Sequence, residues 1–136
     1  MAISDRIAEI FETIENIKKS CGLKDEIFVM AAAKQRSISE IEEAFEGGLK
    51  YFGENRVQEA EEHSAGLKTE IRENIRYHFI GRLQSNKAKR AVKLFDSLDS
   101  VDSLKLAKEI DKFSSEANQV KDIMIEINMG EEQKGG

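Results

Sequence analysis

Lys34 ends an apolar run in a chain otherwise rich in charge, and its amine is the group best placed to do chemistry. The run "IFVMAAAK" over residues 27–34 is too short for a helix and is typical of a fully buried parallel strand. Ligands of parallel α/β proteins bind at the carboxyl ends of the strands. A lysine there is partly desolvated, which favours the neutral amine that forms a Schiff base with a carbonyl-bearing cofactor. The alanines at 31–33 leave room for a flat ring.

A purely structural interpretation of Lys34 is equally open, because a lysine at a strand end can extend its amine into solvent without binding anything. Two further junctions between a strand and a helix open onto the same edge of a parallel sheet: "YFGENRVQEA" (51–60) and "HFIGRLQSNK" (78–87). The first contributes Glu54 and Asn55, and the second contributes His78 and the polar stretch 82–87. These residues are therefore expected near Lys34.

Asn55 and His78 also have structural interpretations. Asn55 can cap the helix that begins near residue 55, and His78 lies inside a predicted strand, where a hydrogen-bonded core histidine is the favoured interpretation. The run "EAEEH" (59–63) and the basic residues within 87–93 are expected on solvent-facing sides of helices. No spacing of His, Cys and Asp residues predicts a metal site.

Helices and strands alternate along the chain. Strands are predicted at 27–34, 49–53, 75–81, within 94–100 and at 120–130. An amphipathic helix is predicted at 3–20, with Ser4 as its N-cap and Cys21-Gly22 as its end. Further helices follow within 37–48, 54–66, 83–95 and 101–117, the first capped by Ser37 and the last by Asp102 or Ser103.

This order predicts the fold class. Strict alternation with short connections implies a parallel sheet with right-handed helical crossovers, in either an open doubly wound sheet or part of a (βα)8 barrel. No glycine-rich dinucleotide fingerprint follows the first strand, which disfavours the doubly wound sheet. We expect residues 1–136 to form a single α/β domain of about five strands with an extra N-terminal helix, and of the two architectures the partial (βα)8 barrel is favoured.

Charge, apolar content and cysteine content exclude several classes of partner and location for this protein. The net charge of −5 argues against nucleic acid or an acidic membrane surface as the main partner. No apolar run approaches the roughly 18 residues that cross a bilayer, and the N-terminus lacks the uninterrupted apolar core of a signal peptide. The single cysteine, Cys21, cannot form an internal disulfide and is expected to be inert, so a cytoplasmic location is expected.

Several segments, in the right order, resemble the pyridoxal-phosphate homeostasis family, whose members are single-domain relatives of the alanine racemase barrel. The segments cover nearly everything from residue 27 to the end of the chain: "AAAK", "FGENRVQEA", "HFIGRLQSNKAK", "SVDSLKLA" and "IEINMGEEQKGG". None of them is specific alone, but together they are highly specific. The resemblance implies an alanine-racemase-type (βα)8 barrel, of which this chain holds the N-terminal part.

The resemblance also implies a cofactor and its ligands. Family members bind pyridoxal 5′-phosphate as an internal aldimine on the lysine that aligns with Lys34, and they buffer or deliver the cofactor without robust turnover. This chain is therefore expected to be a binding protein and not an enzyme. By motif position, Asn55 would lie near the cofactor ring and His78 would line the floor of the site. Asn86 and Lys87 would shape the rim.

The length of the chain bears on whether it can bind the cofactor. A complete (βα)8 barrel needs about 200 to 250 residues, and its phosphate commonly rests on the loops after strands seven and eight. The resemblance places this phosphate clamp beyond residue 136. A partial sheet has open edges beside its first and fifth strands, so a homo-oligomer formed through these edges is expected. The alternative function is a truncated or engineered half-barrel scaffold that folds or self-associates but binds no cofactor.

Overall fold

The computed structural model of the chain describes residues 2–130, which form one parallel sheet and the helices that follow its strands. The strands are β1 (Met30–Ala32), β2 (Tyr51–Glu54), β3 (Arg76–Phe79), β4 (Ser97–Val101) and β5 (Asp122–Ile125). The helices are α1 (Ile3–Cys21), α2 (Ile38–Glu46), α3 (Val57–Gly66), α4 (Thr69–Asn74), α5 (Ala88–Leu94) and α6 (Leu104–Glu116), with the short 3₁₀ helix η1 (Ser85–Lys87) before α5.

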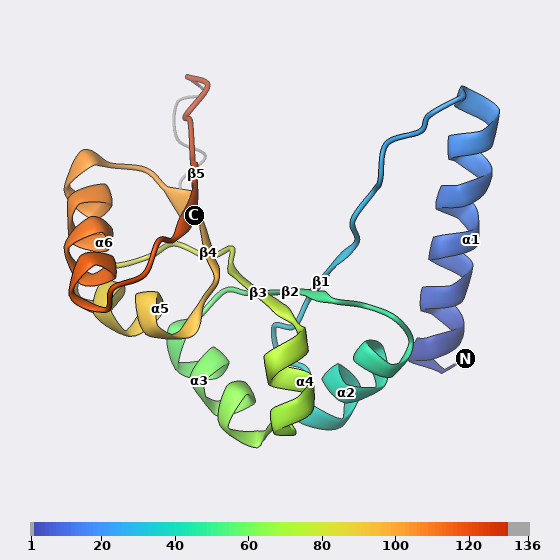
Figure 1. The fold of residues 1–136 in the computed structure, drawn as a ribbon, viewed down its shortest axis with the longest axis horizontal. Coiled ribbons are helices and arrows are strands. Elements are labelled where there is room, and N and C mark those ends of the chain that lie inside the picture. Colours follow the sequence, from blue (N-terminus) through green and yellow to red (C-terminus); the bar gives the residue numbers. More distant parts are fainter. Residues whose placement is uncertain (1, 131–136) are drawn as a thin grey trace.

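The strand order confirms the predicted fold class. The five strands lie in the order β1-β2-β3-β4-β5 and every neighbouring pair is parallel. A doubly wound sheet reverses its strand order at a switch point, whereas this sheet continues in one direction, as a (βα)8 barrel does. Figure 1 shows the helices arranged along the outer side of an arc of strands, which is the arrangement of a partial barrel.

Local sequence signals explain where two helices begin. Ser37 forms a capping box at the start of α2, in which its hydroxyl accepts from the Glu40 N–H and the Glu40 carboxylate accepts from the Ser37 N–H. The Ser103 hydroxyl likewise accepts from the Leu106 N–H at the start of α6. Both predicted caps are therefore confirmed.

The predicted cap at Ser4 is wrong. Helix α1 begins at Ile3, so Ser4 lies inside the helix and Ala2 occupies the N-cap position. The Asp5 carboxylate accepts from the Ala2 N–H at 3.3 Å, so the side chain three residues into the helix satisfies the N–H of the N-cap residue. The helix therefore extends further toward the N-terminus than the serine signal indicated.

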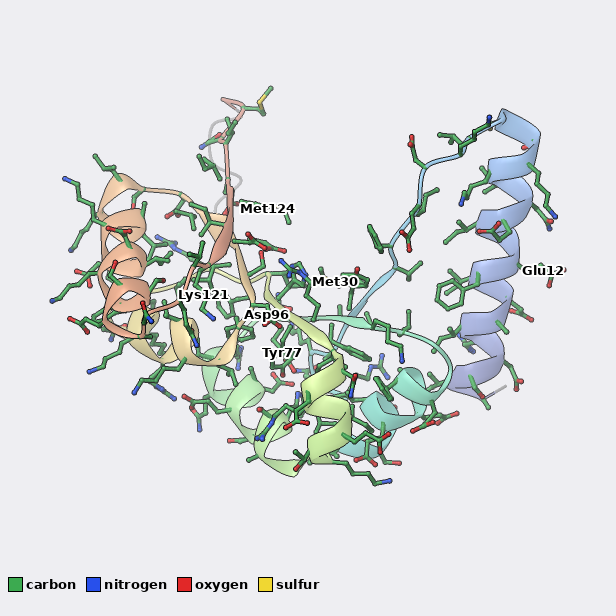
Figure 2. All side chains as sticks on the ribbon, viewed as in Figure 1. Glu12, Met30, Tyr77, Asp96, Lys121 and Met124 are labelled. Atoms are coloured by element: carbon green, nitrogen blue, oxygen red, sulfur yellow. The ribbon has the colours of Figure 1, made fainter. Side chains whose placement is uncertain are left out.

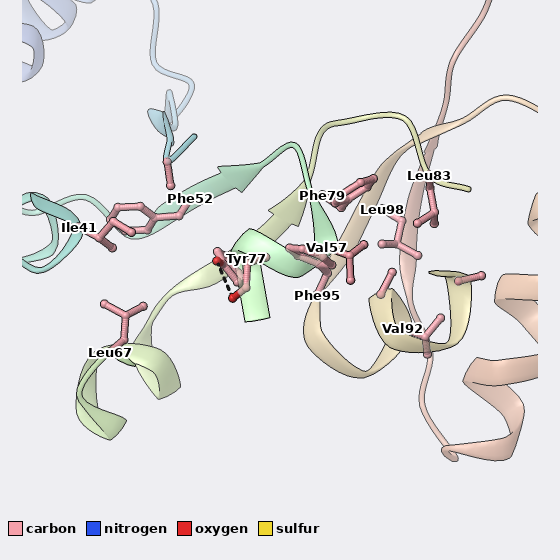
Figure 3. Packing of buried hydrophobic residues seen from close by; sticks show 14 of the residues in the cluster. Ile41, Phe52, Val57, Leu67, Tyr77, Phe79, Leu83, Val92, Phe95 and Leu98 are labelled. Atoms are coloured by element: carbon pink, nitrogen blue, oxygen red, sulfur yellow. Dashed lines mark hydrogen bonds between the residues drawn. The ribbon is translucent and has the colours of Figure 1, made fainter. Parts of the chain in front are cut away.

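The core lies between the sheet and the helices. Phe52, Phe79, Phe95 and Leu98 are almost completely buried, and the rings of Phe79 and Phe95 have centroids 5.2 Å apart. Figure 3 shows these side chains packing with Val57 and Val92 against the helices that follow their strands. Because successive strand residues point to opposite faces, this packing leaves Tyr51, Gly53 and His78 on the face away from the helices.

The expectation of a fully buried first strand is wrong. β1 contains only residues 30–32, and Ile27 and Phe28, which were predicted to lie in it, are 43% and 58% exposed. Among the described residues β1 pairs only with β2, so its outer side has no strand to bury it. The fifth strand behaves in the same way, because all four residues of β5 are exposed although their sequence is apolar on both faces.

Two further differences concern helices. Residues 69–74 form α4, which the periodicity did not predict, because only Ile71 in this short segment is buried. In α1 only Ile7 is buried, and Ile10 and Ile17 are about half exposed. Figure 1 shows that α1 meets the rest of the fold near its N-terminal end, beside α2, and extends away from the sheet. Within the described residues, no helix combines the length and the apolar character that a membrane span requires.

Candidate functional site

The candidate site lies at the carboxyl ends of β1, β2 and β3, on the face of the sheet that the helices leave uncovered. Aromatic rings line part of this face, with Tyr51 lying 4.9 Å from Phe28 and 6.2 Å from His78 between ring centroids. Met30 and Met124 also belong to this side of the sheet (Figure 2). A Cβ added to Gly53 would lie only 2.9 Å from the Met30 sulfur, so the small residue makes room on this face.

Lys34 lies two residues after the end of β1, in a turn between β1 and α2. Its side chain is exposed, so the expectation that the strand end would partly desolvate this amine is wrong. The physical reason is the edge position of β1, which has no second neighbouring strand among the described residues. The amine is consequently reachable by a ligand from solvent.

The turn that carries Lys34 is held by residues of α3. Gln35, the next residue, has a φ of 58°, which places a non-glycine residue in the left-handed region. Its N–H donates to the Glu59 carboxylate, and the carbonyl of Arg36 accepts from His63 Nε2 at 2.8 Å. Two side chains one turn apart on α3 therefore fix the two residues that follow Lys34.

Asn55 follows β2 and is half-buried. It does not cap α3, because Arg56 occupies the N-cap position and makes no side-chain capping bond, so the capping interpretation of Asn55 is wrong. The loop after β3 passes very close to its backbone, since a Cβ added to Gly81 would lie 2.1 Å from the Asn55 carbonyl oxygen. Asn55 lines a cavity of about 440 Å³, whose lining also includes three cationic residues, Arg56, Arg82 and Lys87.

His78 lies on β3 and is buried, with one satisfied nitrogen and one unsatisfied nitrogen. Its Nδ1 lies 2.8 Å from Asp99 Oδ2, and Asp99 Oδ1 accepts from the Ser97 hydroxyl at 2.5 Å. The hydrogen bond at Nδ1 therefore supports the interpretation of His78 as a hydrogen-bonded core residue. In the tautomer that donates from Nδ1 to the carboxylate, Nε2 is an acceptor with a lone pair, and this nitrogen is buried without a hydrogen-bond partner among the described residues.

Sequence reasoning missed a buried polar cluster beside this site. Glu54 is completely buried, and its Oε1 accepts from the Tyr77 hydroxyl at 2.7 Å and lies 2.5 Å from His63 Nδ1. The run "EAEEH" is thus not wholly solvent-facing, because His63 is 7% exposed and Glu59 is half-buried. One carboxylate oxygen of Glu54, one of Glu59 and one ring nitrogen of His63 lie within 4.8 Å of one another. The spacing of these residues in the sequence did not indicate this proximity.

The cluster perturbs two titrating groups. Burial by itself would lower the pKa of His63, but the hydrogen bond and negative charge of Glu54, together with the bond to the Arg36 carbonyl and the charge of Glu59, raise that pKa above its ordinary value. Burial raises the pKa of the Tyr77 hydroxyl, and Glu54 raises it further, so Tyr77 stays a hydrogen-bond donor. The sequence shows only that Glu54 ends a predicted strand and that His63 lies in the helix that follows. It does not show that these two side chains are in contact.

The structure places the three residues singled out in the sequence on or just after three adjacent strands, with Lys34 and Asn55 in the loops after β1 and β2 and His78 within β3. Lys34, Asn55 and His78 belong to the consecutive strands or strand ends β1, β2 and β3, which are adjacent in the sheet order. Within the described residues no hydrogen bond joins the three side chains to one another. The last resembling segment, "IEINMGEEQKGG", continues into 131–136, which lie outside the described residues.

Solved structures resemble this fold closely. PipY of Synechococcus elongatus PCC7942, solved with pyridoxal phosphate bound, has a TM-score of 0.76 and 30% sequence identity over 93% of this chain and 55% of that chain. An unknown protein from Bifidobacterium adolescentis has a TM-score of 0.87 and 31% identity over 98% of this chain and 58% of that chain.

Curated relatives are similar in sequence. The pyridoxal phosphate homeostasis protein of Synechocystis sp. is 36% identical over 84% of this chain, and that of Aquifex aeolicus is 36% identical over 100% of it. The chain spans 52% and 59% of the lengths of these two relatives. The family described as alanine racemase, N-terminal domain, matches residues 6–136. Fold, sequence and family match agree: this chain belongs to the alanine racemase N-terminal domain family, with pyridoxal phosphate homeostasis proteins among its relatives.

Proposed function

We propose that this chain binds pyridoxal 5′-phosphate through Lys34 and serves as a cofactor carrier in pyridoxal phosphate homeostasis. The observation that carries the proposal is the arrangement of Lys34, Asn55 and His78 at the ends of three adjacent strands, in a family with a solved relative that holds this cofactor. Curated relatives named as homeostasis proteins support a carrier role without robust catalytic turnover. The free, exposed thiol of Cys21 fits a cytoplasmic location.

Each of the three residues would have a distinct role. The bound cofactor supplies an aldehyde that a primary amine can attack. Lys34 offers such an amine in an exposed position, from a turn that the hydrogen bonds of Glu59 and His63 hold in place. Asn55 would contact the cofactor ring from the end of β2, and His78 would lie beneath it.

One buried atom tests whether the residues present fit the cofactor. His78 Nε2 has no hydrogen-bond partner, and a buried polar atom without a partner costs about 1 to 3 kcal/mol. A polar group of the ring would meet this need, and the aromatic ring of Tyr51 beside His78 offers a surface for a flat ligand. The amine, the free nitrogen and the aromatic surface together fit the aldehyde and ring of the cofactor.

A direct experiment tests the proposal. The purified chain is mixed with pyridoxal 5′-phosphate, the linkage is reduced with borohydride, and the modified peptide is identified by mass spectrometry. A new visible absorption band and one pyridoxyl phosphate group on the peptide that contains Lys34 are expected. A chain that acquires neither the band nor the mass is a scaffold without cofactor, which is the alternative function.

Asp99 provides a second prediction, because it fixes the proton on His78. Changing Asp99 to alanine removes the acceptor for Nδ1, so the imidazole ring loses the hydrogen bond that fixes its orientation and tautomer. We expect cofactor affinity to fall about tenfold, which corresponds to about 1.4 kcal/mol. Equilibrium titration followed by absorbance measures this change. Asp111→Ala, at an exposed position of α6, is the control, and equal affinities of the two variants would exclude the role of His78.

We also propose that the chain self-associates through β5. Ile123, Met124 and Ile125 are 41%, 51% and 72% exposed, and β5 pairs only with β4 among the described residues. An exposed apolar edge strand readily pairs with another chain. A second copy of this chain would cover the edge by antiparallel or parallel pairing and bury these side chains.

Sedimentation velocity tests this association. At micromolar concentration we expect a mass above that of one chain, and Ile125→Lys should shift the mass to that of a monomer because an edge lysine disfavours pairing. Leu104→Lys is the matched control, since Leu104 is 71% exposed on α6, away from the sheet edge. A single-chain mass for the unmodified protein would contradict the proposal.

A further inference from the structure

A buried histidine connects the core of the protein to the turn that carries Lys34. His63 of α3 contacts Glu54 of β2 through Nδ1, at 2.5 Å, and the Arg36 carbonyl of the β1–α2 turn through Nε2, at 2.8 Å. These two contacts lie on opposite sides of one imidazole ring. His63 is therefore the only side chain of the described residues that hydrogen-bonds both to the buried Glu54 and to the turn after Lys34.

The chemistry of the two partners fixes the protons on His63. A backbone carbonyl only accepts hydrogen bonds, so Nε2 must carry a proton to bond to Arg36. The Glu54 oxygen that faces Nδ1 already accepts from the Tyr77 hydroxyl, and an oxygen that accepts from His63 as well requires Nδ1 to carry a proton too. The protonated imidazolium makes both bonds, whereas a neutral imidazole has one proton and can make only one of them. The adjacent carboxylate charge favours keeping the proton on Nδ1, so the bond to Arg36 is the one that deprotonation removes.

The turn depends on this bond. Gln35 adopts a left-handed φ of 58°, which a non-glycine residue holds only when its surroundings impose it. A backbone bond from the Arg36 N–H to the Ala33 carbonyl, at 3.0 Å, closes the turn around Lys34 and Gln35. Two side-chain contacts add to it, the bond from the Gln35 N–H to Glu59 and the bond from His63 to the Arg36 carbonyl. Loss of the His63 contact leaves Glu59 as the side chain that ties this strained turn to α3.

We infer that His63 is a positioning residue for Lys34, whose protonation holds the Lys34 turn and whose deprotonation releases it. This inference rests on the proposed function, because its consequence is that cofactor attachment at Lys34 weakens as pH rises. The effect has the opposite sign to the chemistry of lysine itself, whose amine becomes more nucleophilic as it loses its proton. The two effects can therefore be separated in one pH profile.

The charged surroundings of His63 agree with the direction of this effect. The titratable groups that face it are Glu54 from β2, Glu59 from α3 and Tyr77 from β3, and the Arg36 guanidinium instead pairs with Glu40 of α2 at 3.5 Å. Glu54 raises the pKa of His63 above its ordinary value of 6.5, against the opposing effect of burial. The two-bond state is thus complete below pH 6.5 and is lost as pH rises through the higher folded-state pKa.

Glu54→Gln is the decisive variant. The glutamine amide can donate to Nδ1 of a neutral His63, whose single proton then remains on Nε2 for the Arg36 carbonyl. Both His63 bonds are kept without any titrating proton. The NH2 group that takes the place of Glu54 Oε1 has a second hydrogen to donate to the Tyr77 oxygen, and the Tyr77 hydroxyl keeps the Ala60 carbonyl, 3.4 Å away, as its acceptor. This variant should therefore hold the turn at every pH.

The experiment measures cofactor attachment and turn order in parallel. Chains are incubated with pyridoxal 5′-phosphate from about pH 6 to about pH 9, reduced with borohydride, and weighed by mass spectrometry. Normalised to Glu54→Gln at each pH, attachment in the unmodified chain should fall about fivefold across this range. In the cofactor-free chain, hydrogen-exchange protection of the Gln35 amide should fall over the same range, but not in Glu54→Gln.

The outcomes separate the two proposals. Parallel pH profiles of the unmodified chain and Glu54→Gln, in attachment and in protection, would overturn the role of His63. Absence of attachment at every pH overturns the proposed function alone, and the exchange data then still decide whether His63 holds the turn. If Glu54→Gln does not fold, His63→Gln replaces it, because an amide cannot titrate and the pH-dependent loss should vanish.

Discussion

Changing Lys34 to alanine is expected to abolish covalent attachment of pyridoxal 5′-phosphate, lowering it at least about a hundredfold, because only a primary amine can form this linkage. The fold should be unaffected. Lys34 is exposed, and substitutions of exposed residues usually change the free energy of unfolding by no more than about 0.5 kcal/mol. Absorbance titration and mass spectrometry after borohydride reduction measure the loss, and urea unfolding confirms that stability is retained.

Two control variants locate the effect in the Lys34 amine. Lys34→Arg keeps the positive charge but lacks the primary amine, so it should fail like the alanine variant if the linkage is what matters. Lys24→Ala changes another exposed lysine, in the segment between α1 and β1, and should leave attachment unchanged. Modification that persists in Lys34→Ala, or that maps to a different lysine, would show that Lys34 is not the attachment site.

Changing Gly81 to alanine should have the largest effect on stability. The added Cβ would lie 2.1 Å from the carbonyl oxygen of Asn55 and 2.8 Å from its Cα, which is far inside contact distance. The obstacle is backbone that β2 and α3 hold on both sides, so it cannot rotate away as a side chain could. We expect a loss of about 3 kcal/mol in the free energy of unfolding, measured by urea denaturation.

The same variant probes the site, because the displaced residue is Asn55. If Asn55 contacts the cofactor ring, Gly81→Ala should also weaken cofactor binding in the fraction that remains folded. Gly66→Ala is the matched control, since its Cβ would meet only the end of the flexible Ile38 side chain, at the far side of α3. Equal unfolding midpoints for the two alanine variants would refute the close approach of the two loops.

The structure places chemical groups at the site in two layers. Lys34, Asn55 and His78 lie at or near the carboxyl ends of adjacent strands, where a ligand can reach the sheet. Behind them, Asp99 bonds to His78, while Glu59 and His63 hold the turn after Lys34. The residues of this second layer are spread over β4 and α3, so the site depends on the packing of several elements.

Much of this arrangement was determined by the sequence alone. Alternating helix and strand signals predicted the parallel α/β fold, and the capping residues Ser37 and Ser103 located the starts of two helices. The positions of Lys34, Asn55 and His78 at three junctions followed from the same pattern. These features depend on interactions between residues close in sequence, such as capping bonds and side-chain periodicity, which a single sequence records directly.

The tertiary structure alone decided burial and long-range pairing. The segments "IFVMAAAK" and "DIMIEIN" have the apolar character that is typical of buried strands. β1 and β5 are nevertheless largely exposed, because each pairs with only one neighbouring strand in the described sheet. Glu54, His63 and Tyr77 come from three elements, and Asp99 reaches His78 from a different strand. The burial of a residue and its partners depend on which elements pack against it, and the local periodicity of a sequence does not contain that information.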